Sequence, residues 1–283
     1  MEEINTNILN KYFINNFKNS KFYKLDFGLE EFRKEDDLHM IIFLAALSGF
    51  NAIDISTKSE FINLAFDAIN QAKQKLNKFN INLNVETLLF ASFGMNLFSN
   101  LDNSQIFKKL EGFKNLNVDV IDIHFNDIDF LNNIKNFDII CEFFKDKMFS
   151  VNLSRKKLSN VHMIDLLEKC YTYKKNNFII EVEGMIIDEN KFSHNLQTIS
   201  TADIINKQFK EKSFKFKKIP IILGNCNSLE IEKLAQECNV PFNGISINYQ
   251  YINNLLKKKS YLCSDEEIND LINEIKSNLF NYY

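Results

Sequence analysis

Tryptophan is absent from this chain of 283 residues, and proline occurs only twice. Phenylalanine, asparagine and lysine are abundant instead, which we interpret as the mutational bias of an AT-rich coding sequence and not as mechanism. Linkers between domains are usually rich in proline, glycine or serine. No such run interrupts the chain, so the sequence predicts a single domain.

Closely spaced cysteines are also missing. The five cysteines are so dispersed that even the nearest pair, Cys226 and Cys238, forms no short metal-binding loop. Zinc ribbons and ferredoxin-type clusters need such pairs, because one loop must present several thiolates to one metal. The sequence therefore predicts reduced, mostly buried thiols. We expect no iron–sulfur cluster, no other metal site and no cofactor.

The chain lacks a large net charge and a long apolar run. Its formal net charge is −3 and its lysines are scattered among acids, unlike the basic patches of nucleic-acid-binding proteins. The longest apolar run, 40–50, is far shorter than the ~20 residues of a membrane helix. The acidic, polar segment 1–13 does not resemble a signal or transit peptide. We therefore expect a soluble, cytoplasmic protein with no nucleic-acid or membrane partner.

Short runs rich in β-forming residues recur about every 32 residues, the length of a β-loop-α-loop unit. Segments with apolar residues at helical spacing separate these runs. The pattern predicts a (β/α)8 barrel, and a doubly wound open sheet with fewer strands is the alternative. The predicted strands are 22–26, 51–56, 88–93, 119–124, 148–153, 178–183, 219–223 and 243–248.

An extra helix is predicted beyond the eighth unit, because Ser264 and Glu267 have the spacing of a capping box before a run of apolar residues at helical spacing. We expect this helix to pack on the outside of the barrel. The predicted organisation is an N-terminal extension (1–20), the barrel (21–258) and the C-terminal helix (259–283).

Acidic residues interrupt the most apolar of the predicted strands. Asp54 and Asp122 each lie between two isoleucines. Side chains on a strand alternate between its two faces, so the isoleucines are predicted to face the helices and the acids to face the barrel interior. The same alternation turns these residues inward: Lys24, Asp26, Ser92, His124, Ser150, Asn152, Glu181, Glu183, Ser246 and Asn248.

Two interpretations of these inward charges remain open. In the first, Lys24 pairs with Asp54 or Glu181 only to neutralise charge in the core, because buried charges must be paired. In the second, the groups form a ligand site, since ligands bind at the C-terminal ends of barrel strands. Lys24 is then a base or Schiff-base nucleophile, and His124 a general base or hydrogen-bond donor. The candidate catalytic residues are Lys24, Asp54, Asp122, His124, Glu181 and Glu183.

The segment 222–230 is similar to a loop that presents backbone N–H groups at the start of a helix. Phosphate sites in barrels commonly use the loops after strands seven and eight. Gly224 is the single glycine of this segment, where such loops are usually rich in glycine. One interpretation is therefore a small anionic ligand near Gly224.

Several segments, taken in order, resemble the light-dependent period protein LdpA family of cyanobacteria, to which a conserved algal chloroplast reading frame is related. Lys24 and Gly28 match a lysine and a glycine of the first strand, and Gly49 and Asp54 match the second strand and the turn before it. The matching segments are 22–28, 47–56, 117–124, 179–186, 222–228 and 242–252.

The chain departs from this family at the loops. The cysteine-rich insertion that holds iron–sulfur clusters in LdpA proteins is missing at 91–100, where no cysteine occurs. Gly184 remains after the sixth strand, and Gly224 and Asn227 remain from a Gly-Gly-Thr-Asn loop. The resemblance implies a barrel connected with light or redox input to the circadian clock. The candidate ligand-binding residues are Gly28, Gly184, Gly224, Asn227 and Ser246.

Two functions therefore remain as hypotheses. The first, which the sequence favours, is a non-catalytic regulatory or interaction protein, a cluster-free relative of LdpA with an unidentified protein partner. The second is a lyase or isomerase that acts on a small, phosphorylated metabolite through Lys24 and the inward carboxylates.

Overall fold

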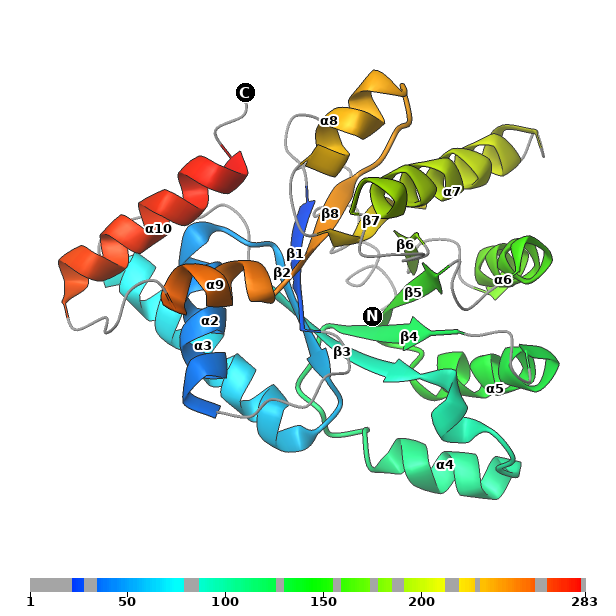
Figure 1. Cartoon of the computed structure of the whole chain (residues 1–283). Helices are drawn as coiled ribbons and strands as arrows, with labels where there is room; N and C mark the ends of the chain where they lie inside the picture. The colour runs from blue at the N-terminus through cyan, green and yellow to red at the C-terminus, as the bar shows by residue number, and fades with distance from the viewer. Residues whose placement is uncertain are drawn as a thin grey trace.

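The computed structural model describes residues 22–27, 35–78, 87–125, 130–154, 159–173, 178–184, 191–211, 219–226, 230–257 and 264–280. Its centre is a closed barrel of parallel strands in which each strand pairs with the next in the chain and the last pairs with the first (Figure 1). The strands are β1 (Phe22–Asp26), β2 (Ala52–Ser56), β3 (Leu88–Gly94), β4 (Val120–His124), β5 (Met148–Ser154), β6 (Phe178–Glu183), β7 (Ile221–Cys226) and β8 (Gly244–Asn248). Pairing of β8 with β1 excludes the open-sheet alternative.

Helices surround the barrel on its outer face (Figure 1). They are α2 (Glu35–Ser48), α3 (Ser59–Lys78), η2 (Met95–Phe98), α4 (Asn103–Glu111), α5 (Phe130–Phe143), α6 (Asn160–Tyr173), α7 (Lys191–Glu211), α8 (Glu230–Glu237), α9 (Gln250–Lys257) and α10 (Asp265–Phe280). The alternation of strands and helices confirms the predicted (β/α)8 barrel. Within the described residues, none of these helices combines the length and apolar character that crossing a membrane requires.

The C-terminal helix α10 follows the eighth unit, as the sequence predicts. Its capping box is present: the Ser264 backbone N–H donates to Glu267 Oε2 at 3.0 Å, and the Glu267 N–H donates to Ser264 Oγ at 3.2 Å. The helix packs against α2 on the outside of the barrel. Lys75 of α3 also donates to Asp265 at 2.7 Å. The predicted extension 1–20 lies outside the described residues.

The strands separate two apolar layers. Ile53 and Ile55 belong to the larger layer, which fills the space between barrel and helices. The smaller layer lies inside the barrel and comes from the earlier residues of the strands. We call it the apolar floor. It consists of Phe22, Ala52, Leu88, Phe90, Val120, Met148, Ile179 and Ile222.

The described cysteines agree with the expectation of unpaired, mostly buried thiols. Cys141, Cys170 and Cys226 are buried, Cys238 is exposed, and all are free. Burial raises the pKa of the Cys226 thiol well above its usual value, with the nearby carboxylates of Glu181 and Glu183 acting in the same direction. The thiol form is therefore the stable one at neutral pH.

Candidate functional site

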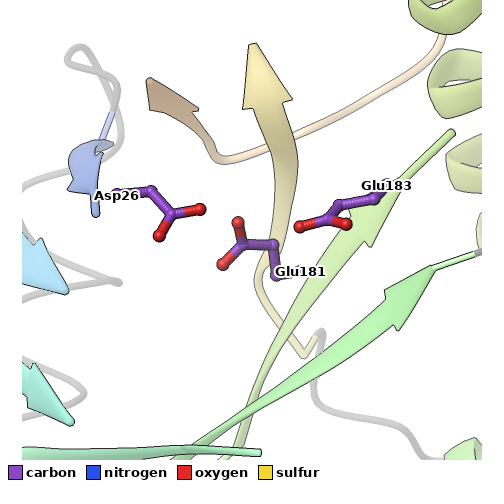
Figure 2. Close-up of side chains that lie close together, drawn as sticks. All are labelled: Asp26, Glu181 and Glu183. Carbon is purple, nitrogen blue, oxygen red and sulfur yellow. The ribbon is translucent and has the colours of Figure 1, made fainter. Parts of the chain in front are cut away.

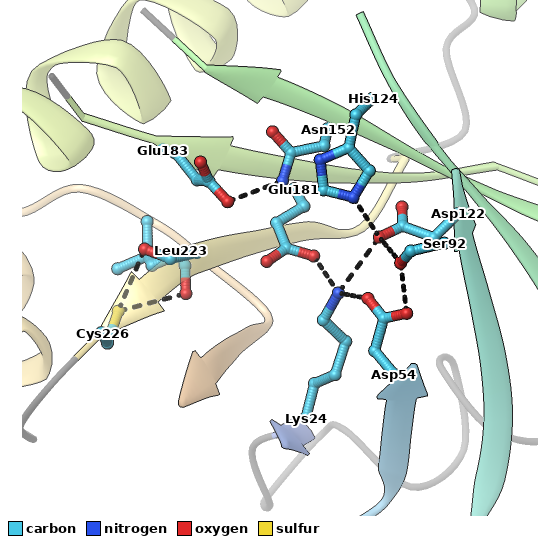
Figure 3. Close-up of polar contacts among 11 residues, drawn as sticks. Lys24, Asp54, Ser92, Asp122, His124, Asn152, Glu181, Glu183, Leu223 and Cys226 are labelled. Carbon is cyan, nitrogen blue, oxygen red and sulfur yellow. Dashed lines mark hydrogen bonds and ion pairs between the residues drawn. The ribbon is translucent and has the colours of Figure 1, made fainter. Parts of the chain in front are cut away.

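The ammonium group of Lys24 contacts three carboxylates inside the barrel (Figure 3). Its Nζ lies 2.5 Å from Asp54 Oδ2 and 3.3 Å from Asp122 Oδ2, and it forms an ion pair with Glu181 Oε2. All four side chains are buried. The inward direction predicted for these residues is therefore correct, and the predicted pairing of Lys24 with Asp54 or Glu181 extends to both residues and to Asp122.

The apolar floor lies against this charged group. Nζ of Lys24 is 5.4 Å from the centre of the Phe90 ring, a cation–π distance. Strand register explains the arrangement, because Lys24 pairs with Ala52 on β2 and the Lys24 side chain extends along the interior to reach the next inward position, Asp54. The ammonium thus lies near one aromatic ring and contacts three acid oxygens.

The charges of this cluster hold Lys24 in its protonated form. Burial alone would lower the pKa of Lys24, but attraction to Asp122, Asp54 and Glu181 outweighs burial and raises it well above its usual value. A Schiff-base nucleophile or general base requires the neutral amine. The surroundings of Lys24 favour an electrostatic function over either role predicted for it from the sequence.

Asp54 and Asp122 have pKa values displaced in opposite directions. Burial raises the pKa of Asp54, and Lys24 only partly opposes that effect. Burial also acts on Asp122, but Lys24 and His124 outweigh it, so the pKa of Asp122 lies well below its usual value. Ser92 Oγ lies within hydrogen-bond distance of both carboxylates. Because a hydroxyl has one proton, Ser92 donates to one of them at a time. The pair therefore favours one protonated acid and one carboxylate.

His124 lies at the C-terminal end of β4, above Asp122. Its buried Nε2 is 3.4 Å from Asp122 Oδ2, an ion-pair separation. Burial lowers the pKa of His124, but Asp122 and then Glu183 outweigh burial and raise it to about 9. The imidazolium form is therefore present at neutral pH and is paired with Asp122.

Two further acids, Asp26 and Glu183, meet Glu181 toward the strand ends, and we call these three residues the acidic triad (Figure 2). Glu181 is fully buried, and its Oε1 accepts no hydrogen bond from a described residue. Burial raises the pKa of Glu181 to about 8, and Lys24 opposes this rise. Glu183 is partly exposed and accepts a hydrogen bond of 2.8 Å from Asn152 Nδ2.

Gly224 leaves room for the side chains of Glu181 and Glu183 because it has no Cβ atom. A Cβ atom at this position would lie 2.8 Å from Glu181 Oε1 and 2.8 Å from Glu183 Cγ. The strand β7 continues through Gly224 to Cys226, with an irregular register against β8. The predicted phosphate loop is therefore strand as far as Cys226, and Asn227 lies outside the described residues.

The other candidate ligand-binding residues lie on separate elements of the barrel. Gly184 follows β6 and donates its backbone N–H to Thr198 Oγ1 of α7 at 2.7 Å. Ser246 pairs with Lys24 in the sheet register, and its buried Oγ has no hydrogen-bond partner among the described residues. Gly28 lies outside the described residues. Ligand binding by these residues stays a prediction.

Sequence reasoning turned Asp26, Ser92 and Asn152 inward but left them out of the candidate set. Each contacts or adjoins a member of that set: Ser92 bridges the two aspartates, Asn152 holds Glu183, and Asp26 completes the acidic triad. The available signal was strand alternation. It gives the direction of a side chain, but it does not say which side chains meet across the barrel.

No family model matches the chain, and no curated protein matches it. Many solved structures share its fold. The apo homocysteine methyltransferase MmuM from Escherichia coli has a TM-score of 0.55 and 10% identity, over 90% of this chain and 97% of the other. The YdjI aldolase from Escherichia coli K12 has a TM-score of 0.54 and 11% identity, over 94% and 92%. A putative deoxyribose-phosphate aldolase from Coccidioides immitis has a TM-score of 0.54 and 8% identity, over 92% and 100%. At such identities the likeness shows the barrel fold alone.

Proposed function

We propose that this protein is a small-molecule enzyme of the lyase or isomerase class, with its active site at the C-terminal ends of the barrel strands. The observation that carries the proposal is the excess of acid in the interior. Lys24 contacts three carboxylates, and two more, Asp26 and Glu183, adjoin Glu181.

An ion network that serves only folding needs no such excess. Burying a carboxylate costs several kcal/mol unless it is paired, so a structural lysine is best matched by one or two acids. Clusters of titratable groups with displaced pKa values are instead characteristic of active sites. The cluster also occupies the end of the barrel where barrel enzymes bind their substrates.

The geometry assigns a separate role to each group. His124, which is protonated and is the last residue of β4, would donate a proton to the substrate. Glu183, which is held by Asn152, would accept one. Lys24 would act through its charge, by keeping Asp122 ionised beneath His124. Lyases and isomerases need such a donor and acceptor, because a proton leaves one substrate atom and another atom receives one.

The charge of the site also bears on the substrate. The carboxylates of Asp26 and Glu183 would repel a phosphate unless a cation lies between them and the phosphate. We therefore infer that a neutral or cationic group of the substrate, or a metal-bound anion, occupies this end of the barrel. The sequence-based hypothesis of a small anionic ligand is thereby restricted to an anion that binds together with a metal ion.

Thermal shift with a metabolite library tests the proposal. We expect at least one hydroxy-, keto- or amino-substituted compound to raise the melting temperature of the wild-type chain. His124→Asn and Glu183→Gln should abolish that shift and any turnover, while Glu111→Gln, on the exposed face of α4, should retain both. A compound whose stabilising effect survives both site variants would refute the location of the site.

A second candidate is the regulatory, cluster-free LdpA-like protein. The order of the matching sequence segments supports it, and so does the engagement of Lys24 by three acids, which leaves no neutral amine for covalent chemistry. A wild-type chain that responds to no small molecule, but co-purifies with one protein in a fixed ratio from its native source, would favour this candidate over the enzyme.

A further inference from the structure

We propose that the acidic triad binds one divalent cation of the oxygen-preferring class, Mg²⁺ or Mn²⁺. The inference rests on the proposed function, because the ion would lie in the same active site and position the substrate there. Asp26 supplies one oxygen from β1, while Glu181 and Glu183 supply oxygens from β6 (Figure 2).

The spacing of the three carboxylates fits one coordination sphere. One oxygen from each lies within 4.8 Å of the others. Oxygen ligands lie about 2.0–2.6 Å from Mg²⁺ or Ca²⁺, so two ligands of one ion are at most about 5 Å apart. The side chains therefore need no large rearrangement to reach a common ion.

A separate observation comes from the unpaired oxygen of Glu181. This side chain is fully buried, and its Oε2 forms the ion pair with Lys24. Its Oε1 has no hydrogen-bond partner among the described residues, although a buried polar atom without a partner is costly. Figure 2 shows the Glu181 carboxylate between those of Asp26 and Glu183. A cation held by the triad would satisfy Oε1.

A second group of three acids in the barrel already surrounds a positive charge. Asp54, Asp122 and Glu181 also bring one oxygen each within 4.8 Å. Lys24 Nζ contacts all three, so the lysine takes the place that a metal would occupy there. In the acidic triad, by contrast, Glu183 accepts its hydrogen bond from the uncharged amide of Asn152. That contact brings no positive charge to Glu183.

The ligand types select the ion. Carboxylate oxygens favour Mg²⁺, Mn²⁺ and Ca²⁺, whereas Zn²⁺ and Cu⁺ favour imidazole and thiolate. Cys226 adjoins the glutamates, but its thiol donates to the backbone carbonyls of Leu223 and Gly224 at 3.2 and 3.5 Å. A thiol engaged in this way is not poised to join the coordination sphere.

The test is titration of the EDTA-treated full chain with MnCl₂, followed by electron paramagnetic resonance and calorimetry. We expect one saturable Mn²⁺ site per chain, from which MgCl₂ displaces the manganese. Removing one ligand charge, as in Glu183→Gln or Asp26→Asn, should weaken binding at least about tenfold. The matched surface variant Glu111→Gln should bind like the wild type, because it removes the same charge from an exposed helix.

Absence of saturable binding by the wild type up to about 10 mM Mn²⁺ would overturn the inference. Wild-type affinity in both Glu183→Gln and Asp26→Asn would overturn it as well. If circular dichroism shows that one of these variants is unfolded, the Mn²⁺ affinity of the other variant decides whether the triad binds the ion. All Mn²⁺ binding is measured without an organic ligand. Absence of Mn²⁺ binding would therefore refute the metal site and leave the proposed enzyme function untouched. The enzyme function is refuted separately, by the metabolite screen.

Discussion

Nζ of Lys24 and Oδ2 of Asp54 are 2.5 Å apart across neighbouring strands, and each side chain is only 1% exposed. Asp122 and Glu181 complete the surroundings of the same ammonium (Figure 3). The stability of the barrel therefore depends on one cation that several acids share. Removing the cation should cost more than removing any surface charge, because the acids cannot reach water.

Replacing Lys24 with methionine should lower the free energy of unfolding by about 3–5 kcal/mol, since it leaves buried carboxylates without a counter-charge. Urea unfolding followed by circular dichroism measures the loss. Lys75→Met is the matched control, because Lys75 pairs with an Asp265 side chain that is 73% exposed. We expect the control to lose less than about 1 kcal/mol. Equal losses in the two variants would contradict a central role for Lys24.

Stability should decrease on the alkaline side of neutrality. The pKa of His124 is raised from 6.5 to about 9 by Asp122 and by the charges of Glu183 and Asp54, which outweigh burial. A raised pKa contributes stability that is complete below 6.5 and is lost as pH rises through about 9. The whole contribution is at most about 3.5 kcal/mol, since one pKa unit corresponds to about 1.4 kcal/mol.

The difference between wild type and His124→Asn isolates this effect, measured as the unfolding free energy from pH 6 to pH 10 in EDTA. The variant should show a flatter decline than the wild type. His39→Asn removes a histidine that pairs with an exposed Asp67 at 3.3 Å, and it should leave the wild-type slope in place. Parallel curves for wild type and His124→Asn would show that Asp122 does not stabilise the imidazolium.

Gly224→Ala should disturb both stability and metal binding. The added methyl group would lie 2.8 Å from Glu181 Oε1 and from Glu183 Cγ, so both glutamates must shift. We expect a loss of about 1–3 kcal/mol from overpacking, together with weaker Mn²⁺ binding. Gly112→Ala is the control, because Gly112 has helical φ and ψ values and its added methyl group would lie 3.2 Å from one backbone oxygen. Its stability should change by less than about 1 kcal/mol.

The purified protein should be colourless and free of iron. The described cysteines lie on or just after separate elements, and three of them are buried thiols. Iron–sulfur clusters are held by several thiolates around one site. Iron analysis and visible absorption measure the outcome, and a brown protein that absorbs at about 400 nm would show that thiolates assemble a cluster after all.

Much of the fold was predictable because the strands repeat one simple signal. Apolar runs such as 22–26 and 178–183 match β1 and β6 to the residue. The bounds of the seventh strand were predicted least accurately. The prediction was 219–223, whereas β7 spans Ile221–Cys226. Gly224 within this strand suggests a loop. In the structure, however, the absence of a Cβ at Gly224 leaves room for the side chains of Glu181 and Glu183. A glycine signal cannot distinguish a turn from close packing.

The sequence predicted which side chains of the candidate site point into the barrel, but not which of them contact one another. Alternation correctly turned Asp54, Asp122 and Glu181 toward the interior. Which of them meet depends on the stagger of the strands around the barrel and on the length of the Lys24 side chain. No single strand carries that information. For this reason the acidic triad, whose members come from β1 and β6, was not recognisable as a set.

The apolar floor makes the interior of the barrel asymmetric. Phe22, Phe90 and their neighbours fill the end where the strands begin, so the charged groups are screened from water on that side. His124 and Glu183, which are partly exposed, lie at the opposite end, where their strands finish. Among the described residues the interior is thus polarised along the barrel axis, with apolar side chains where the strands begin and charged side chains where they end.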